Sequence, residues 1–157
     1  MHLTGRYPDW WRGRRFDKPV RAWVGSVTGE VTRDTVQRML VGDPRHRAAW
    51  GEGMIPGDCL GRPSMRTGVK DCIEGVLVQH VTGGMSSLGF KTYEAGRERW
   101  QGETLDFVWF DEEPPMDVYM EGLTRTNASG GCVYITFTPL FGMSDVVHMF
   151  LEDSKVS

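Results

Sequence analysis

The acid pair Asp111-Glu112 is the part of the sequence whose residue types and spacing best suit chemistry. It directly follows residues 105–110 (LDFVWF), a mostly apolar run typical of a buried strand, which the prolines at 114 and 115 close off. Ligands of open α/β sheets bind at the carboxyl ends of strands. Phosphoryl transfer to water needs one carboxylate that holds Mg²⁺ on a nucleotide, which suits Asp111. It also needs a group that orients or deprotonates the water, which suits Glu112. A solvated turn is the alternative interpretation of the pair alone.

A second polar signal stands at the end of residues 132–138 (CVYITFT), one helical crossover after the acid pair. In motor ATPases a strand in this position lies beside the acidic strand, and a polar residue at its tip senses the γ-phosphate. Thr138 is the first choice for that residue and Thr136 the second. Threonine is also a common strand residue for packing reasons alone. The interpretation therefore depends on the acids one crossover upstream.

The elements that must position these residues alternate between strands and helices. Apolar and β-branched runs predict strands at 20–28, 75–81, 86–93, 105–110 and 132–138, the second and third forming a hairpin around 82–84. Helical patterns cover 32–40, 94–100, 116–128 and 142–152, whereas 43–68 is rich in Gly and Pro and predicts a loop with short irregular pieces. This alternation predicts an α/β fold with a mainly parallel sheet, in one domain.

Composition excludes several classes of protein. The 157 residues are 39% hydrophobic and 25% charged, which argues against disorder. Three separate cysteines fit neither a disulfide framework nor a zinc ribbon, and no apolar run reaches membrane-helix length, so we expect a cytoplasmic protein without a membrane partner. The net charge of −3 means that nucleic acid would have to be bound by a local patch. The basic run 12–21, near Trp10 and Trp11, is one such patch or simply a solvated loop.

A phosphate-binding loop is not found in the sequence. Such a loop reads G-x-x-x-x-G-K-[ST], and its lysine reaches the β- and γ-phosphates. Residues 84–92 (GMSSLGFKT) come near this pattern, but Phe90 separates the glycine from Lys91. The segment also falls on a predicted strand instead of opening a helix. We therefore do not expect it to bind phosphate.

Residues 87–102 (SLGFKTYEAGRERWQG), followed by 106–115 (DFVWFDEEPP), resemble the large terminase subunit of tailed bacteriophages. The opening residues 2–11 (HLTGRYPDWW) resemble the stretch that follows the phosphate-loop helix in that family. The resemblance covers almost the whole chain. It implies an ATPase domain of the P-loop NTPase type (RecA-like, with an additional strand), followed in the family by an RNase H-like nuclease.

The resemblance also implies roles for single residues. Asp111 corresponds to the Walker B aspartate, Glu112 to the catalytic glutamate, and 136–138 to the coupling motif. The family's arginine that reaches a neighbouring subunit's nucleotide aligns with Gln101, a departure, and the arginines that could replace it are Arg97 and Arg99. For each, an exposed helix arginine is the alternative. The implied cofactors are ATP and Mg²⁺, and the implied partners are double-stranded DNA, the portal protein, the small terminase subunit and further copies in a ring, in the bacterial host cell.

Two alternatives to an incomplete motor domain spanning 1–157 remain at this stage. One is a metal-dependent nuclease that uses Asp106, Asp111, Glu112 and Glu113, although Asp106 and Asp111 would point to opposite faces of a strand. The other is a non-catalytic prophage remnant. In the motor interpretation the phosphate loop and the nuclease lie outside this chain, so we expect little or no ATP hydrolysis by the chain alone.

We predict marginal stability for the isolated chain. The family topology places the missing first strand beside residues 132–138, and without it an apolar sheet edge is left uncovered, which favours aggregation. Thermal unfolding followed by circular dichroism, together with light scattering, measures this. A soluble monomer that unfolds cooperatively at an ordinary mesophile temperature would contradict the prediction.

Overall fold

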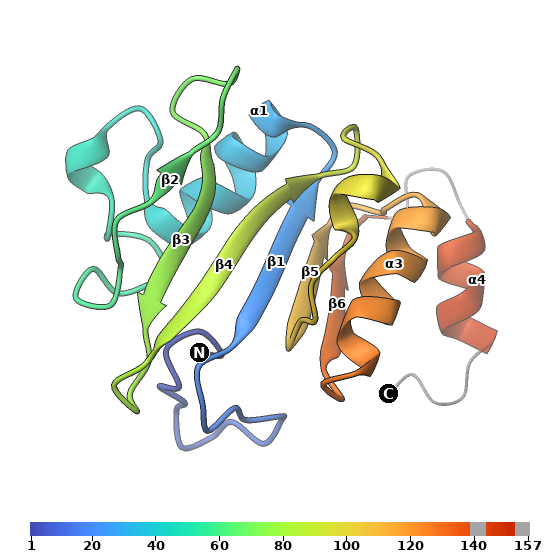
Figure 1. Cartoon of the computed structure of the whole chain (residues 1–157), viewed down its shortest axis with the longest axis horizontal. Helices are drawn as coiled ribbons and strands as arrows, with labels where there is room; N and C mark the ends of the chain where they lie inside the picture. The colour runs from blue at the N-terminus through green and yellow to red at the C-terminus, as the bar shows by residue number, and fades with distance from the viewer. Residues whose placement is uncertain (139–143, 153–157) are drawn as a thin grey trace.

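The computed structural model describes residues 1–138 and 144–152, the last three by their backbone only. A six-stranded sheet in the order β2-β3-β4-β1-β5-β6 forms the centre of the molecule (Figure 1). The strands β1, β4, β5 and β6 are mutually parallel, whereas β2 and β3 are antiparallel to their neighbours. The predicted α/β fold with a mostly parallel sheet is confirmed. The strands are β1 Arg21–Ser26, β2 Ser64–Met65, β3 Ile73–Gln79, β4 Met85–Thr92, β5 Phe107–Asp111 and β6 Cys132–Thr136.

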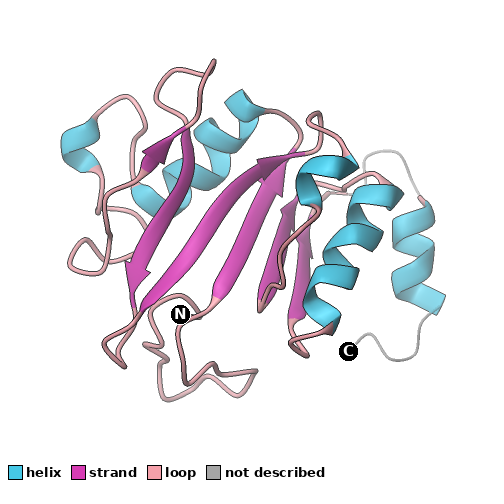
Figure 2. Ribbon diagram, in the orientation of Figure 1, coloured by secondary structure: helices cyan, strands magenta, loops and turns pink. Residues whose placement is uncertain are grey.

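Helices pack on both faces of this sheet (Figure 2). One continuous helical segment comprises α1 Gly29–Thr32, the π-helical turn η1 Arg33–Gln37 and α2 Arg38–Val41. The others are the 3₁₀ turns η2 Arg47–Ala49 and η3 Arg97–Trp100, and the helices α3 Met116–Asn127 and α4 Asp145–Glu152. Within the described residues no helix has the length and apolar character needed to cross a membrane.

Two hydrophobic cores, one on each face, explain the apolar central strands. Ala22 and Val24 of β1 point into the core that Val36 of η1 helps to form. Trp23, between them, points to the opposite face and the core that contains Val118 of α3. Because both faces of the parallel strands are covered, successive side chains are buried on alternate faces, and the sequences of these strands are continuous apolar runs.

Most differences from the sequence predictions concern where elements begin and end. The first helix begins at Gly29, not at Thr32, because the Thr28 side chain caps it by accepting from the Val31 N–H at 3.2 Å. The short pieces expected within the loop 43–68 are η2 and β2, and the sequence did not predict that β2 joins the sheet by pairing with β3. The predicted helix at 94–100 is only the turn η3. The predicted helix start at Gly142 lies outside the described residues, and α4 begins at Asp145.

The strand β6 lies at one end of the sheet and pairs, within the described part of the chain, with β5 alone. This is the edge where the family resemblance placed an absent first strand. The marginal stability expected for the isolated chain stays a prediction.

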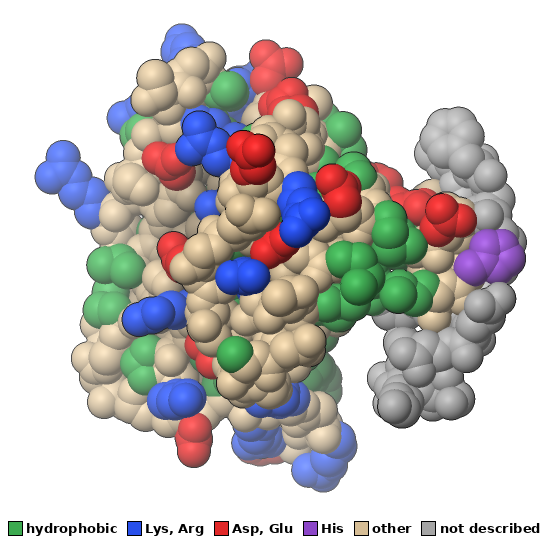
Figure 3. All heavy atoms as spheres, turned by 45° about the vertical axis from the view of Figure 1, so that its right-hand side comes forward, with side chains coloured by type: hydrophobic (Ala, Val, Ile, Leu, Met, Phe, Trp, Pro, Cys, Tyr) green, Lys and Arg blue, Asp and Glu red, His purple; other side chains and the backbone are tan. Residues whose placement is uncertain are grey.

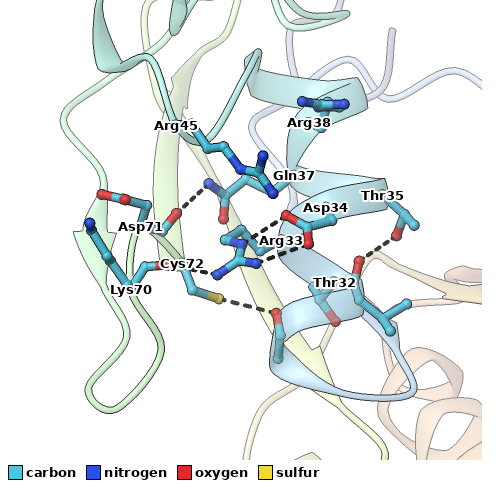
Figure 4. Close-up of polar contacts among 12 residues, drawn as sticks. Thr32, Arg33, Asp34, Thr35, Gln37, Arg38, Arg45, Lys70, Asp71 and Cys72 are labelled. Carbon is cyan, nitrogen blue, oxygen red and sulfur yellow. Dashed lines mark hydrogen bonds and ion pairs between the residues drawn. The ribbon is translucent and has the colours of Figure 1, made fainter.

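The Gln37 side chain fastens the π-helical turn to β3 (Figure 4). It is fully buried, its amide nitrogen donates to the Asp71 carbonyl at 2.8 Å, and its amide oxygen accepts from the Ile73 N–H at 2.7 Å. Nearby, the Arg33 guanidinium pairs with Asp34 and donates to the Lys70 carbonyl at 3.0 Å. These contacts hold the helix in place over the sheet.

We predict that Gln37→Met destabilises the fold. Methionine keeps the volume but leaves the Ile73 N–H buried without a partner, which costs about 1–3 kcal/mol, and also removes the donor to the part-buried Asp71 carbonyl. Urea denaturation of the chain, followed by tryptophan fluorescence, measures the free energy of unfolding. The matched control is Gln101→Met, the same change at an exposed glutamine. Equal unfolding free energies for the two variants would contradict the prediction.

Candidate functional site

The parallel strands bring four polar residues to their carboxyl ends on one face of the sheet. Asp111 at the end of β5 pairs in register with Thr136 of β6, and Ser26 of β1 pairs with Thr92 of β4. Asp111 and Ser26 also directly follow the paired residues Phe110 and Gly25. The predicted placement of the acidic strand beside the 132–138 strand, parallel to it, is therefore confirmed.

The Asp111 carboxylate is held by hydroxyl groups. Thr136 Oγ1 donates to Asp111 Oδ1 at 3.2 Å and accepts in turn from the Trp109 indole N–H at 2.7 Å. At the other carboxylate oxygen, Thr35 Oγ1 of η1 lies 3.4 Å from Asp111 Oδ2, although its shorter bond is to the Val31 carbonyl at 2.7 Å (Figure 4). The Trp109 indole thus orients the hydroxyl that orients the carboxylate.

Glu112 follows with an exposed side chain and an unusual backbone. Its φ of 63° lies in the left-handed region, which residues other than glycine rarely adopt. Its N–H donates to the Thr136 carbonyl at 2.8 Å, and its carbonyl lies 2.9 Å from the Tyr93 hydroxyl. Backbone strain of this kind persists only where the surroundings hold it, and it concentrates at functional sites.

Of the two threonines proposed from the sequence, the structure brings only Thr136 to the acid pair. Thr138 lies two residues beyond the end of β6, is exposed, and makes no hydrogen bond to any described residue. Sequence reasoning ranked Thr138 first because it stands last in the predicted strand. The strand ends earlier, and the register selects Thr136.

Neither arginine proposed from the sequence contacts the acid pair. Arg97 pairs at 3.0 Å with Glu121 of α3, a buried carboxylate that Arg125 also contacts at 3.0 Å. Arg99 lines a cavity of about 470 Å³ on the sheet face that carries Trp23. Both arginines are on η3. Arg97 has a structural partner in this chain, whereas Arg99 is exposed to solvent.

The structure also places the lysine of the near-miss phosphate loop and the acids of the nuclease alternative. Lys91 lies on β4, as predicted, with its ammonium 4.0 Å from the centre of the Trp23 ring, and burial lowers its pKa.

The acids of the nuclease alternative do not converge. Asp106 precedes β5, at the opposite end of the strand from Asp111, and its carboxylate accepts from the Arg21 N–H at 2.8 Å. Among residues 1–138 and 144–149, no three His, Cys, Asp or Glu side chains are placed so that they could hold a metal ion.

The donor set at the carboxyl edge fits Mg²⁺ bound through a nucleotide. One carboxylate, Asp111, is flanked by the hydroxyls of Thr136 and Thr35, so every nearby side-chain donor is an oxygen. Mg²⁺ prefers oxygen and is commonly held by only one or two carboxylates, with substrate phosphates and water as its remaining ligands. A single carboxylate is therefore sufficient for a nucleotide-bound ion but not for a two-metal nuclease site.

Sequence reasoning missed Tyr93 and Trp109 as parts of the site. Both stand in segments that were predicted as strands, where aromatic residues are expected for packing alone. The only signal for Tyr93 was its position at the end of a strand, where side chains of parallel sheets approach ligands. Nothing in the spacing indicated its contact with Asp111 and Glu112.

The surface view shows charges of both signs intermingled on one face (Figure 3). Lys and Arg side chains lie among Asp and Glu side chains rather than in one large patch. In the basic run 12–21, Arg14 stacks on Phe16 and the Trp11 indole donates to the Arg14 carbonyl at 2.9 Å. The run is thus a loop packed on aromatic rings.

The fold and site define an α/β domain whose polar groups gather at the carboxyl edge of parallel strands. Residues 1–156 match the family described as terminase large subunit, T4likevirus-type, N-terminal. The chain is 42% identical to the large terminase subunit of Salmonella phage P22, over all of this chain and 35% of that protein. It is 31% identical to the large terminase subunit of Enterobacteria phage LP7, over 85% of this chain and 28% of that protein. The chain belongs to the large terminase subunit family and spans about a third of the length of these relatives. No solved structure matches it.

We predict that Thr136→Val destabilises the carboxyl edge and that Thr138→Val does not. Valine removes both the bond to Asp111 and the acceptor for the Trp109 indole, and a typical hydrogen bond contributes about 0.5–1.5 kcal/mol. Urea denaturation measures both variants, and Thr136→Ser, which keeps the hydroxyl, should unfold like the parent chain. A loss as large in Thr138→Val would show that the contact with Asp111 is not the cause.

Proposed function

We propose that this chain is part of the ATP-hydrolysing motor domain of a phage DNA-packaging terminase. The observation that carries the proposal is the contact between Asp111 and Thr136 across neighbouring parallel strands, at the sheet edge where nucleotides bind in α/β proteins. Membership of the large terminase subunit family supports the same conclusion. The domain type in this proposal is the P-loop NTPase, RecA-like with an additional strand.

In this proposal Asp111 holds the Mg²⁺ that neutralises charge on the ATP phosphates. Glu112, exposed directly beside it, orients and deprotonates the attacking water. The Thr136 hydroxyl keeps the Asp111 carboxylate in place through its bond at 3.2 Å. As the neighbouring strand's last residue, it also transmits the state of the nucleotide to the segment that follows β6.

The proposal requires groups that this chain does not supply. No segment of the sequence reads G-x-x-x-x-G-K-[ST], so the phosphates are bound by residues outside 1–157. Of the two arginines proposed from the sequence, Arg97 is paired with Glu121, so Arg99 is the one that we assign to a neighbouring subunit's nucleotide. The partners in this proposal are double-stranded DNA, the portal protein, the small terminase subunit and further copies in a ring.

We predict that Glu112→Gln abolishes most ATP hydrolysis in a chimera. In this chimera the chain replaces the aligned segment of the Salmonella phage P22 large subunit, of which it covers 35%. Loss of a general base typically costs about 10²- to 10⁴-fold in rate, whereas ATP binding should remain because glutamine keeps the side-chain size. Steady-state phosphate release measures turnover, and a fluorescent ATP analogue measures binding.

Glu113→Gln is the matched control, since it removes the neighbouring acid, and it should keep turnover near that of the parent chimera. The unfused chain should hydrolyse little or no ATP. A parent chimera that is folded but inactive would support a non-catalytic remnant, and hydrolysis that is unaffected by Glu112→Gln would refute the assigned role.

A further inference from the structure

Three backbone carbonyls converge on the hydroxyl of Tyr93. The phenol oxygen lies 2.9 Å from the Asp111 carbonyl, 2.9 Å from the Glu112 carbonyl and 3.1 Å from the Gly25 carbonyl. Tyr93 directly follows β4, so one hydroxyl joins the carboxyl ends of β4, β1 and β5. A phenol has one proton to donate, and it is therefore shared among these three acceptors.

The Tyr93 ring cannot easily move away from this position. The residue is buried, and its ring lies 6.1 Å from the rings of Trp100 and Phe110. Its own N–H donates to the Ser26 carbonyl at 3.0 Å. Burial, and then the negative charges of Asp111 and Glu112, raise the pKa of Tyr93, so the hydroxyl keeps its proton and acts as a donor at neutral pH.

The strained backbone of Glu112 is held by hydrogen bonds. Both the backbone N–H and the backbone carbonyl of Glu112 have hydrogen-bond partners. The N–H is bound to the Thr136 carbonyl of β6, and the carbonyl is bound to the Tyr93 hydroxyl. Two contacts of this kind hold the φ of 63°, and the backbone angles at Glu112 set the direction in which its Cβ leaves the sheet.

We propose that Tyr93 is a positioning residue that holds the left-handed turn at Glu112 and so places the Glu112 carboxylate for reaction. This inference rests on the proposed function, because placement matters only if Glu112 takes part in hydrolysis. A group moved by about 1 Å can lose about 10²-fold in rate. The Tyr93 hydroxyl bonds to backbone carbonyls, those of Asp111 and Glu112 among them, so its effect on the Glu112 carboxylate passes through the backbone.

The test compares Tyr93→Phe with Tyr7→Phe in the chimera with the P22 large subunit. Tyr7 is the matched control, because its hydroxyl also bonds to backbone, accepting from the Phe16 N–H at 2.7 Å, but lies outside the site. We expect Tyr93→Phe to lower kcat for ATP hydrolysis by about 10- to 100-fold with KM within about twofold. Tyr7→Phe should leave both constants near those of the parent.

A double variant separates positioning from a loss of stability. If Tyr93 acts through Glu112, Tyr93→Phe should lower turnover no further once Glu112→Gln is present. Hydrogen exchange at the Glu112 N–H, measured on the chain itself, should become at least about tenfold faster in Tyr93→Phe and stay unchanged in Tyr7→Phe.

The outcomes distinguish this inference from the function on which it rests. If Glu112→Gln lowers turnover but Tyr93→Phe does not, the positioning role is wrong and the motor function stands. If neither variant lowers turnover, the role assigned to Glu112 is wrong and the positioning role falls with it, whereas a folded parent chimera without turnover would contradict the motor function itself. Additive losses in the double variant, or equal losses in Tyr7→Phe, would also overturn the positioning role.

Discussion

The in-register parallel pairing of β5 with β6 is the constraint on which the site depends. It places Asp111 opposite Thr136 at the carboxyl edge, and a shift of one residue would turn Thr136 to the other face of the sheet. Such a shift is prevented by the cores, because Val133 and Ile135 of β6 pack on one face while Tyr134 packs on the other. The hydrophobic packing therefore sets the geometry of the polar site.

The acid pair is held from both faces of the sheet. Hydroxyls of Thr136 and Thr35 approach the Asp111 carboxylate from one side, and the Tyr93 hydroxyl meets the backbone carbonyls from the other. Tyr93 is itself supported by Trp100, whose ring stacks 5.2 Å from that of Phe110. A strained residue such as Glu112 persists in this position because rigid neighbours on both sides determine its backbone.

The sequence predicted the ends of elements correctly where turn residues or prolines next to the element mark them. The glycines at 83 and 84 marked the hairpin between β3 and β4, and the prolines at 114 and 115 marked the end of the strand that carries the acid pair. Where a boundary depends on a remote contact, the prediction was wrong. β2 exists through its remote pairing with β3. The helix start at Gly29 was missed for a different reason, because its cap is a local contact from the Val31 N–H to the Thr28 hydroxyl that the predicted start at Thr32 did not use.

The sequence by itself determined that two acids would follow a buried strand and that a second strand would come one helical crossover later, because apolar runs and turn residues are local properties of the chain. That the two strands are neighbours was expected only by analogy with motor ATPases, and the pairing of β5 with β6 confirms it. Only the tertiary structure decided which hydroxyls reach the acids. Thr136 was selected over Thr138 by the register, and Tyr93 by the approach of β4 to the ends of β1 and β5. These contacts join residues far apart in the chain, and no periodicity within one segment specifies such distances.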